Sequence, residues 1–268
     1  MDNLLPYVTA DEISPFERLV RLMEVLRSEK GCAWDRAQSH KSLLPYLVEE
    51  SYEVIEAIEE GRFDDLPEEL GDLQLQILFH SQIARERGAF EIDDCLTLTL
   101  NKMIARHPHV FGDKKELNPQ QVRDQWEQIK TRSGEKKSVL GGVPKHLPAL
   151  TMAFRIGEKA GGRGFDWETP EQVFEKITEE ISEVKAELAP DKPRDKERIS
   201  AEIGDLLFAV ASLARKLGVE PETALRGALV KFRERFDKLE ENVNADRGEF
   251  EKYTLDELEN IWQRIKRD

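Results

Sequence analysis

Two pairs of acidic residues in the second half of the sequence have the spacing of one helix face. Glu180 and Glu183 are three residues apart. Glu202 and Asp205 have the same spacing farther along the chain. Residues three or four apart project from the same side of an α-helix, so two packed helices would bring the four carboxylates together. Their mutual repulsion requires protons, solvent or a cation. Carboxylate-only ligation favours Mg²⁺ first and Mn²⁺ second, whereas zinc normally recruits His or Cys.

A solvated acidic helix face is the alternative for either pair alone, because the chain holds 54 Asp and Glu residues. Both pairs, however, adjoin apolar stripes that predict helix packing. Ile177 and Ile181 accompany the first pair, and Leu206 and Val210 accompany the second. We therefore favour a metal site built on two packed helices.

A basic pair and a tryptophan follow these carboxylates. Lys231 and Arg235 are four residues apart, a spacing that usually marks a solvated or salt-bridged helix face. In the company of four carboxylates the pair is better suited to clamp phosphate groups. Trp262 is either an ordinary core residue or a surface on which a nucleobase stacks.

The chain repeats these blocks in one order. The first-half blocks are an acidic pair at Glu50 and Glu53, a second at Glu69 and Asp72, a basic pair at Lys102 and Arg106, and Trp126. Each lies between 129 and 136 residues before its second-half counterpart. Such a repeat indicates two copies of one helical module. We predict an N-terminal module at 1–132, a linker at 133–148 that is rich in Gly, Lys and Pro, and a C-terminal module at 149–268. The four N-terminal carboxylates are a possible second metal site.

The elements that position these residues are predicted to be helices almost throughout. Apolar residues recur at helical spacing, and Thr169-Pro170 is typical of a helix start. Alternation with a period of two is scarce. The expected fold is therefore all-α, with helices near 41–60, 66–87, 92–106, 119–132, 147–160, 170–188, 195–217, 221–242 and 254–267.

Composition argues against several classes of protein. A net charge of −14 over 268 residues argues against a nucleic acid polymer as partner. The longest nearly apolar stretch, 206–214, is too short to span a membrane. Two cysteines make no disulfide framework and the N-terminus lacks a secretory pattern, so a cytoplasmic location is expected.

These motifs carry a resemblance to a known family. An EExxE block followed by ExxD on the next helix resembles the all-α nucleoside triphosphate pyrophosphohydrolases, and the tandem arrangement resembles the MazG family. Supporting strings are GCAWD (31–35), RHPHVFGD (106–113), WEQIK (126–130) and GFDW (164–167). The resemblance implies Mg²⁺-dependent hydrolysis of NTPs and dNTPs between the α and β phosphates, which gives a nucleoside monophosphate and pyrophosphate. It also implies a homodimer whose sites are built from a four-helix core.

Carried over by position, the resemblance implies the site residues of the C-terminal module. The implied metal ligands are Glu180, Glu183, Glu202 and Asp205. The implied substrate-binding residues are Lys176, Glu179, Glu180, Arg198, Ala201, Asp205, Lys231, Arg235 and Trp262. Glu180 and Glu179 are the expected catalytic residues, with Glu179 orienting or deprotonating the attacking water.

The two modules differ where a triphosphate is expected to lie. Lys176 stands four residues before Glu180, and its N-terminal counterpart is Tyr46. Arg198 stands four residues before Glu202, and its counterpart is Asp65. We therefore expect the C-terminal module to do most of the catalysis. The expected roles of the N-terminal module are weak metal binding, regulation or support of assembly.

Two other classes of protein compete with this interpretation. A di-iron carboxylate bundle needs Glu-x-x-His motifs, and the sequence contains none. A non-catalytic helical adaptor with acidic faces for a partner stays open, although the repeated acid, base and Trp blocks disfavour it. No residue indicates which base or sugar is preferred.

Overall fold

The computed structural model describes residues 5–9, 12–112, 116–119, 121–122, 125–126, 129, 138–190 and 192–267. Within these residues every regular element is a helix, which confirms the predicted all-α class. Much of the predicted helix at 119–132 and residues 133–137 of the predicted linker lie outside the described residues. In the described part of the chain, no helix is long and apolar enough to cross a membrane. The chain divides into two compact units, Met1–Glu116 and Leu117–Asp268, which are described separately below.

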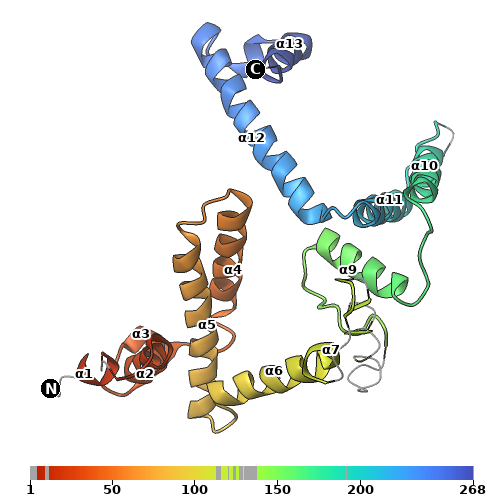
Figure 1. The fold of residues 1–268 in the computed structure, drawn as a ribbon. Coiled ribbons are helices and arrows are strands. Elements are labelled where there is room, and N and C mark those ends of the chain that lie inside the picture. Colours follow the sequence, from red (N-terminus) through yellow and green to blue (C-terminus); the bar gives the residue numbers. More distant parts are fainter. Residues whose placement is uncertain are drawn as a thin grey trace. The chain divides into compact units, whose positions relative to one another are not determined.

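The N-terminal unit is organised around a hairpin of two long helices, α4 and α5 (Figure 1). Its elements are α1 (Leu5–Val8), α2 (Pro15–Arg27), α3 (Ala33–Ala37), α4 (Leu44–Glu59), α5 (Leu66–Glu86), α6 (Ile92–Arg106) and α7 (Pro108–Phe111). Helix α2 packs against α5. The buried core consists of Met23, Leu43, Leu78, Phe79 and Ile83.

The C-terminal unit contains an equivalent hairpin, α10 and α11, with α9 packed on α11. Its elements are α9 (Ala149–Gly161), α10 (Pro170–Glu187), α11 (Lys196–Lys216), α12 (Pro221–Asp246), the short 3₁₀ helix η1 (Phe250–Lys252) and α13 (Leu255–Ile265). Helix α13 folds back on the far half of α12 (Figure 1), around the buried side chains of Leu239, Val243 and Ile261.

The two hairpins are the structural form of the sequence repeat. Helices α5 and α11 each have 21 residues, and each is followed two residues after its end by a glycine. Gly88 has a φ of 65° and Gly218 a φ of 72°, a left-handed conformation that glycine adopts without a Cβ clash. After each glycine the chain turns back onto the helix, where the N–H of Ala89 donates to the carbonyl of Ala84 at 3.0 Å. The repeat therefore extends from the carboxylates to the helix ends.

Capping residues fix where each of the two helices of the C-terminal hairpin begins. Thr169 and Gln172 form a capping box at the start of α10. The Asp195 side chain accepts hydrogen bonds from the first backbone N–H groups of α11. Because each cap satisfies donors that have no partner inside the helix, it sets the register from which the acidic side chains project.

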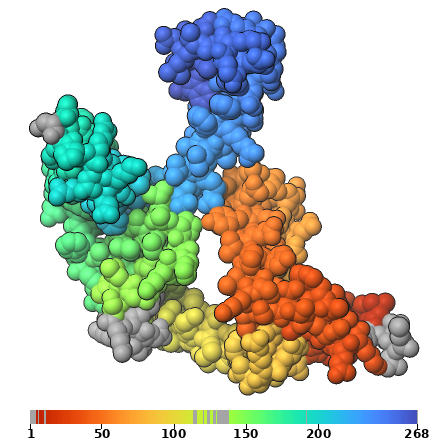
Figure 2. Space-filling view, turned by 180° about the vertical axis from the view of Figure 1, so that it is seen from behind, coloured from red at the N-terminus to blue at the C-terminus, as the bar shows by residue number. Residues whose placement is uncertain are grey.

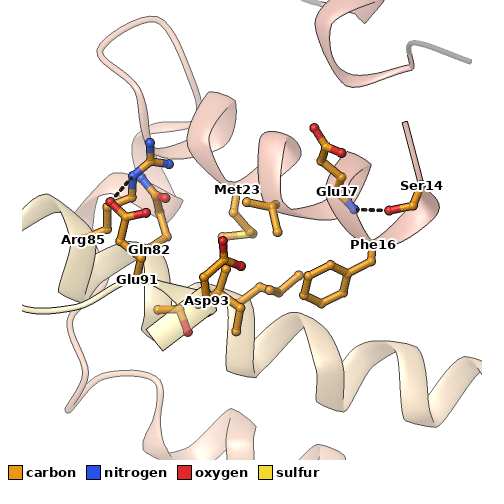
Figure 3. Close-up of a pocket in the computed structure, with 12 residues that line it drawn as sticks. Ser14, Phe16, Glu17, Met23, Gln82, Arg85, Glu91 and Asp93 are labelled. Carbon is orange, nitrogen blue, oxygen red and sulfur yellow. Dashed lines mark hydrogen bonds and ion pairs between the residues drawn. The ribbon is translucent and has the colours of Figure 1, made fainter. Parts of the chain in front are cut away.

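A pocket of about 370 Å³ lies between α2, α5 and α6 of the N-terminal unit (Figure 3). Apolar side chains line it, including Phe16 and Met23, and charged groups stand at its edge. Among the latter, Arg85 Nε lies 3.6 Å from Glu91 Oε1. None of the lining residues belongs to the predicted metal sets, so this pocket is separate from them.

Candidate functional site

Helices α10 and α11 bring three predicted metal ligands together. Glu180, Glu202 and Asp205 each offer one carboxylate oxygen, and these oxygens lie within 4.8 Å of one another. Glu180 is only 4% exposed, whereas Asp205 lies at the surface. Carboxylate oxygens that converge in this way, with an opening to solvent, form a donor set suited to a hard divalent cation.

Glu183, the fourth predicted ligand, lies at the edge of this group. A hydrogen bond between its carboxyl group and that of Glu180 raises the pKa of Glu183. Desolvation and the negative charges of Glu180 and Glu202 raise this pKa further. The structure thus places Glu183 next to the three converging carboxylates without including its oxygen among them.

Lys176 contributes a positive charge to the C-terminal cluster. Its Nζ lies 2.6 Å from Glu180 Oε1 and 2.9 Å from Glu179 Oε1. Hydrogen bonds to these two carboxylates, that of Glu180 first, raise the pKa of Lys176 well above its ordinary value. Lys176 therefore stays charged and neutralises part of the acidic cluster.

The second oxygen of Glu180 has no such partner. Glu180 Oε2 is buried, and no hydrogen-bond donor in the described part of the chain reaches it. A buried carboxylate oxygen without a donor is costly, and nearly all such groups in folded proteins are satisfied. This oxygen is the observation that fits a cation to the cluster, because a divalent ion would satisfy it.

Helices α4 and α5 assemble the equivalent set in the N-terminal unit. One oxygen each of Glu50, Glu69 and Asp72 lies within 4.8 Å of the others. Desolvation raises the pKa of Glu50, as do a hydrogen bond with Glu53 and the charge of Asp72. Desolvation also raises the pKa of Glu69, followed by the charge of Glu53. Glu53 thus stands beside its cluster as Glu183 does beside the other.

The N-terminal cluster differs in the groups that surround it. Tyr46 replaces the lysine, and its ring meets that of Trp34 edge to face with centroids 5.8 Å apart. Asp65, the counterpart of Arg198, pairs with Arg62 at 2.6 Å. The lysine that neutralises the C-terminal cluster therefore has an aromatic counterpart here.

Arg198 and Ala201, two implied substrate-binding residues, lie in the first turns of α11. The Arg198 side chain is 70% exposed, and its Nε lies 3.6 Å from Asp195 Oδ2. Ala201 is also exposed and directly precedes Glu202. Both residues are accessible from solvent near the cluster.

Lys231, Arg235 and Trp262 lie on the other helical pair of the C-terminal unit. The Trp262 ring has its centroid 5.1 Å from that of Phe232 on α12 and packs on the small core of α12 and α13. The main contacts of α10 are with α11, and those of α13 are with α12. Within the described residues, Lys176 therefore contacts the carboxylate cluster, whereas Trp262 packs on α12.

Comparison with known proteins finds the same family domain at each of the two hairpins. The family model described as the MazG nucleotide pyrophosphohydrolase domain matches residues 38–111 and again residues 168–239. The chain belongs to the MazG family. Each match spans one carboxylate hairpin, which confirms the predicted tandem repeat.

MazG relatives resemble the chain over nearly its whole length. It is 49% identical to the nucleoside triphosphate pyrophosphohydrolase/pyrophosphatase MazG of Thermotoga maritima, over 94% of this chain and 95% of the relative. It is 42% identical to the nucleoside triphosphate pyrophosphohydrolase of Escherichia coli K12, over 95% of this chain and 98% of the relative. These names support the predicted enzyme class and do not favour the adaptor alternative.

Sequence reasoning missed two residues that organise the MazG hairpins. The first is Gln76, which donates from Nε2 to Glu50 Oε1 at 3.4 Å. Its signal was a polar residue four positions after Asp72, inside an apolar stripe where the second hairpin has Ala209.

The second residue is Asp166 of the GFDW string. Its carboxylate accepts from Arg215 at 2.5 and 3.1 Å, and Lys216 Nζ lies 2.8 Å away. Desolvation acts to raise the pKa of Asp166, but these hydrogen bonds outweigh it and lower the pKa. The sequence held no signal for this partnership, because the partners are about 50 residues apart and meet only through the packing of α11.

Proposed function

We propose that the C-terminal hairpin is the active site of a nucleoside triphosphate pyrophosphohydrolase. The substrates are NTPs and dNTPs, and the bond that breaks joins the α and β phosphates. The products are a nucleoside monophosphate and pyrophosphate. The observation that carries the proposal is the convergence of the Glu180, Glu202 and Asp205 carboxylates, together with a buried Glu180 oxygen that no donor among the described residues reaches.

A Mg²⁺ ion fits this donor set, and Mn²⁺ is the expected substitute. Glu180, Glu183, Glu202 and Asp205 would hold it. When bound, the ion supplies positive charge that neutralises the triphosphate and polarises its phosphoryl groups. The orphaned oxygen of Glu180 supports this proposal, because a divalent ion would satisfy it.

Two side chains of the cluster are suited to move a proton and to hold a phosphate. Glu179 is exposed and projects from the turn that carries Lys176 and Glu180. We assign Glu179 to accept the proton of the attacking water as its oxygen bonds to the α phosphorus. The bridging oxygen then leaves with its electron pair on pyrophosphate. Lys176 is placed to donate to a phosphate oxygen while it keeps Glu179 and Glu180 in position.

The proposal includes a homodimer. Helix α12 carries a row of large apolar side chains that are between 37% and 60% exposed, namely Leu225, Leu229, Phe232 and Phe236. On the face seen in Figure 2, much of α12 is not covered by other parts of its unit. Exposed apolar rows of this kind are typical of protein interfaces. We propose that Lys231, Arg235 and Trp262 contact the nucleotide in the assembled dimer, because within the described residues α10 packs mainly on α11 while α13 packs on α12.

We also propose a cytoplasmic location. Cys32 and Cys95 are both free, which agrees with a reducing compartment. Soluble nucleoside triphosphates are the substrates that such a compartment supplies.

Product analysis tests the reaction. The purified chain is incubated with each NTP and dNTP in Mg²⁺, and the products are separated by chromatography. Monophosphate with pyrophosphate is the expected result, whereas diphosphate with orthophosphate would place the cut at the wrong bond. Glu180→Gln should abolish turnover, and Glu50→Gln should leave most of it. The opposite pattern would assign catalysis to the N-terminal hairpin.

A further inference from the structure

The pocket between α2, α5 and α6 is not used by the proposed reaction. Its volume of about 370 Å³ lies within the range of about 300–1,000 Å³ that small-molecule sites occupy in proteins. All three helices contribute to its apolar wall, which consists of Phe16, Val20, Met23, Leu78 and Ile92. Met23 and Leu78 are each 2% exposed and belong to the buried core of the unit. The pocket therefore reaches from the surface to the core, and an apolar group inside it would be removed from water.

The charged side chains at the edge of the pocket are mostly acidic. Glu17, Glu91 and Asp93 are exposed carboxylates that line it, and Arg85 is the basic residue among the lining side chains. Figure 3 shows Arg85 and Glu91 together at one end of the pocket and Phe16 at the other. Because three acids and one base surround the opening, a cation is favoured over an anion there.

The positive charge of Arg85 is already engaged by carboxylates. Its Nε lies 3.6 Å from Glu91 Oε1, and its Nη1 pairs with Glu24. By contrast, in the part of the chain that the structure describes, no ion pair engages Asp93, which lies in the first turn of α6. An anionic ligand would have to displace a carboxylate from Arg85, whereas a cationic ligand would find Asp93 unpaired.

Two further side chains of the pocket suit a ligand that donates hydrogen bonds. Ser81 is 5% exposed, and its hydroxyl donates to the carbonyl oxygen of Ile77 at 2.9 Å. Since this bond uses its one hydrogen, the Ser81 hydroxyl can accept a hydrogen bond from a ligand but cannot donate one. The ring of Phe16 offers an aromatic face, on which organic cations bind favourably. An ammonium group has N–H donors and no acceptor, and so matches both side chains.

We propose that this pocket binds an organic ammonium ion that carries an apolar body. The body packs on the apolar wall in contact with Met23, and the ammonium pairs with Asp93 at the edge. An inorganic cation has no apolar body to fill the wall, and a nucleotide has the wrong charge for the opening. A bound ligand would contact α2, α5 and α6 together and so stabilise the N-terminal unit. This inference goes beyond the proposed function and does not rest on it, because the pocket includes neither carboxylate cluster.

Nuclear magnetic resonance of the full chain with ¹³C-labelled methionine methyl groups tests the site. The probe is phenylbutylamine, and phenylbutanol and phenylbutyrate are its neutral and anionic counterparts with the same apolar body. Met23 lines the pocket, whereas Met103 and Met152 do not, and Met23→Leu identifies the Met23 resonance. Phenylbutylamine should shift the Met23 methyl resonance in a saturable way, with the weak affinity of about 1 mM expected for a probe of its size. The resonances of Met103 and Met152 should stay in place.

The charge of the probe and of the pocket should matter together. Phenylbutanol should bind about 2- to 5-fold more weakly than phenylbutylamine, as expected for the loss of one exposed ion pair, and phenylbutyrate more weakly still. Asp93→Asn should weaken the binding of phenylbutylamine by about 2- to 5-fold and leave that of phenylbutanol unchanged. Asp94→Asn is the matched control, because it removes the same charge from the same turn of α6 but does not line the pocket. It should keep the wild-type affinity.

A filled pocket gives an independent check. Val20→Phe places a larger side chain in the apolar wall and should abolish the response of Met23 to phenylbutylamine. Circular dichroism checks that each variant is folded, and Val20→Leu, with a smaller loss of affinity expected, serves where Val20→Phe does not fold.

Three results would each overturn the proposal. The first is a Met23 resonance that phenylbutylamine does not shift. The second is phenylbutanol or phenylbutyrate binding as tightly as phenylbutylamine. The third is an affinity for phenylbutylamine that is the same in Asp93→Asn as in wild type. Pyrophosphate release is measured separately and should be equal in wild type and Asp93→Asn, so failure of this proposal leaves the catalytic one untouched.

Discussion

Replacing Lys176 with Met removes a charged group that contacts both Glu179 and Glu180. The ammonium has three N–H donors, and two of them are taken by these carboxylates at 2.9 and 2.6 Å. One donor is therefore left for a phosphate oxygen. The loss of one such donor from a site that stabilises developing negative charge lowers kcat by about 10²- to 10³-fold. We expect kcat/KM for the triphosphate to fall by the same factor.

The same change should affect ion binding in the opposite direction. Without Lys176, Glu180 keeps its buried oxygens and loses its cation partner. The C-terminal cluster then resembles the N-terminal one, and Mn²⁺ should bind to it more tightly without nucleotide. Steady-state release of pyrophosphate measures the first effect, and an Mn²⁺ titration measures the second.

Lys185→Met is the matched control for this prediction. Lys185 lies on the same helix, α10, nine residues later, which places it on the opposite side of the helix, and it is exposed. The control should keep the wild-type kcat/KM. If Lys176→Met also kept it, the assignment of Lys176 to the phosphate would be wrong. If kcat/KM fell equally in both variants, the effect would come from net charge and not from position.

Two further predictions concern stability. Asp166→Asn removes the carboxylate partner of Arg215, whose side chain is 11% exposed. It should lower the free energy of unfolding by about 1–3 kcal/mol, after allowance for partial exposure. An unchanged urea midpoint would contradict this prediction. Burial, and to a smaller extent the charge of His40, lowers the pKa of His80, so the unfolded chain binds the proton more readily and stability should fall as pH drops below about 6.5. Between pH 7.5 and 5.5 the urea midpoint of the N-terminal unit should therefore fall less in His80→Gln than in wild type. Glu50 and Glu69 contribute with the opposite sign at lower pH, and they do so in both proteins. An equal fall of the midpoint in the two proteins would count against the reasoning.

The helices were predictable because their signals are local. Apolar periodicity predicted 66–87, and α5 spans Leu66–Glu86. It predicted 195–217, and α11 spans Lys196–Lys216. In the structure, Gly88 and Gly218 follow the ends of these helices, and a glycine of this kind acts within a few residues of a helix end. The short helices α3 and α7, of five and four residues, have too few turns to show a period.

The carboxylate sets were predictable for a different reason. Each pair lies on one helix face, and the repeat linked the pairs across the two halves. The partners of Gln76 and Asp166 were not predictable, because they depend on how two helices pack. Lys176 was identified by its position relative to Glu180, but its double contact with Glu179 required coordinates. The grouping of Trp262 with Phe232 likewise depends on how α13 folds back.

The small core formed by Leu239, Val243 and Ile261 is separate from the acidic hairpin of its unit. Local opening follows such boundaries, because segments with few buried contacts detach at a lower free energy than the whole domain. The far end of α12 and α13 can therefore fray as one piece while Glu180 and Asp205 stay in place. Backbone amides of α13 should accordingly exchange with deuterated solvent sooner than those in the middle of α11, and a protease should cut there first.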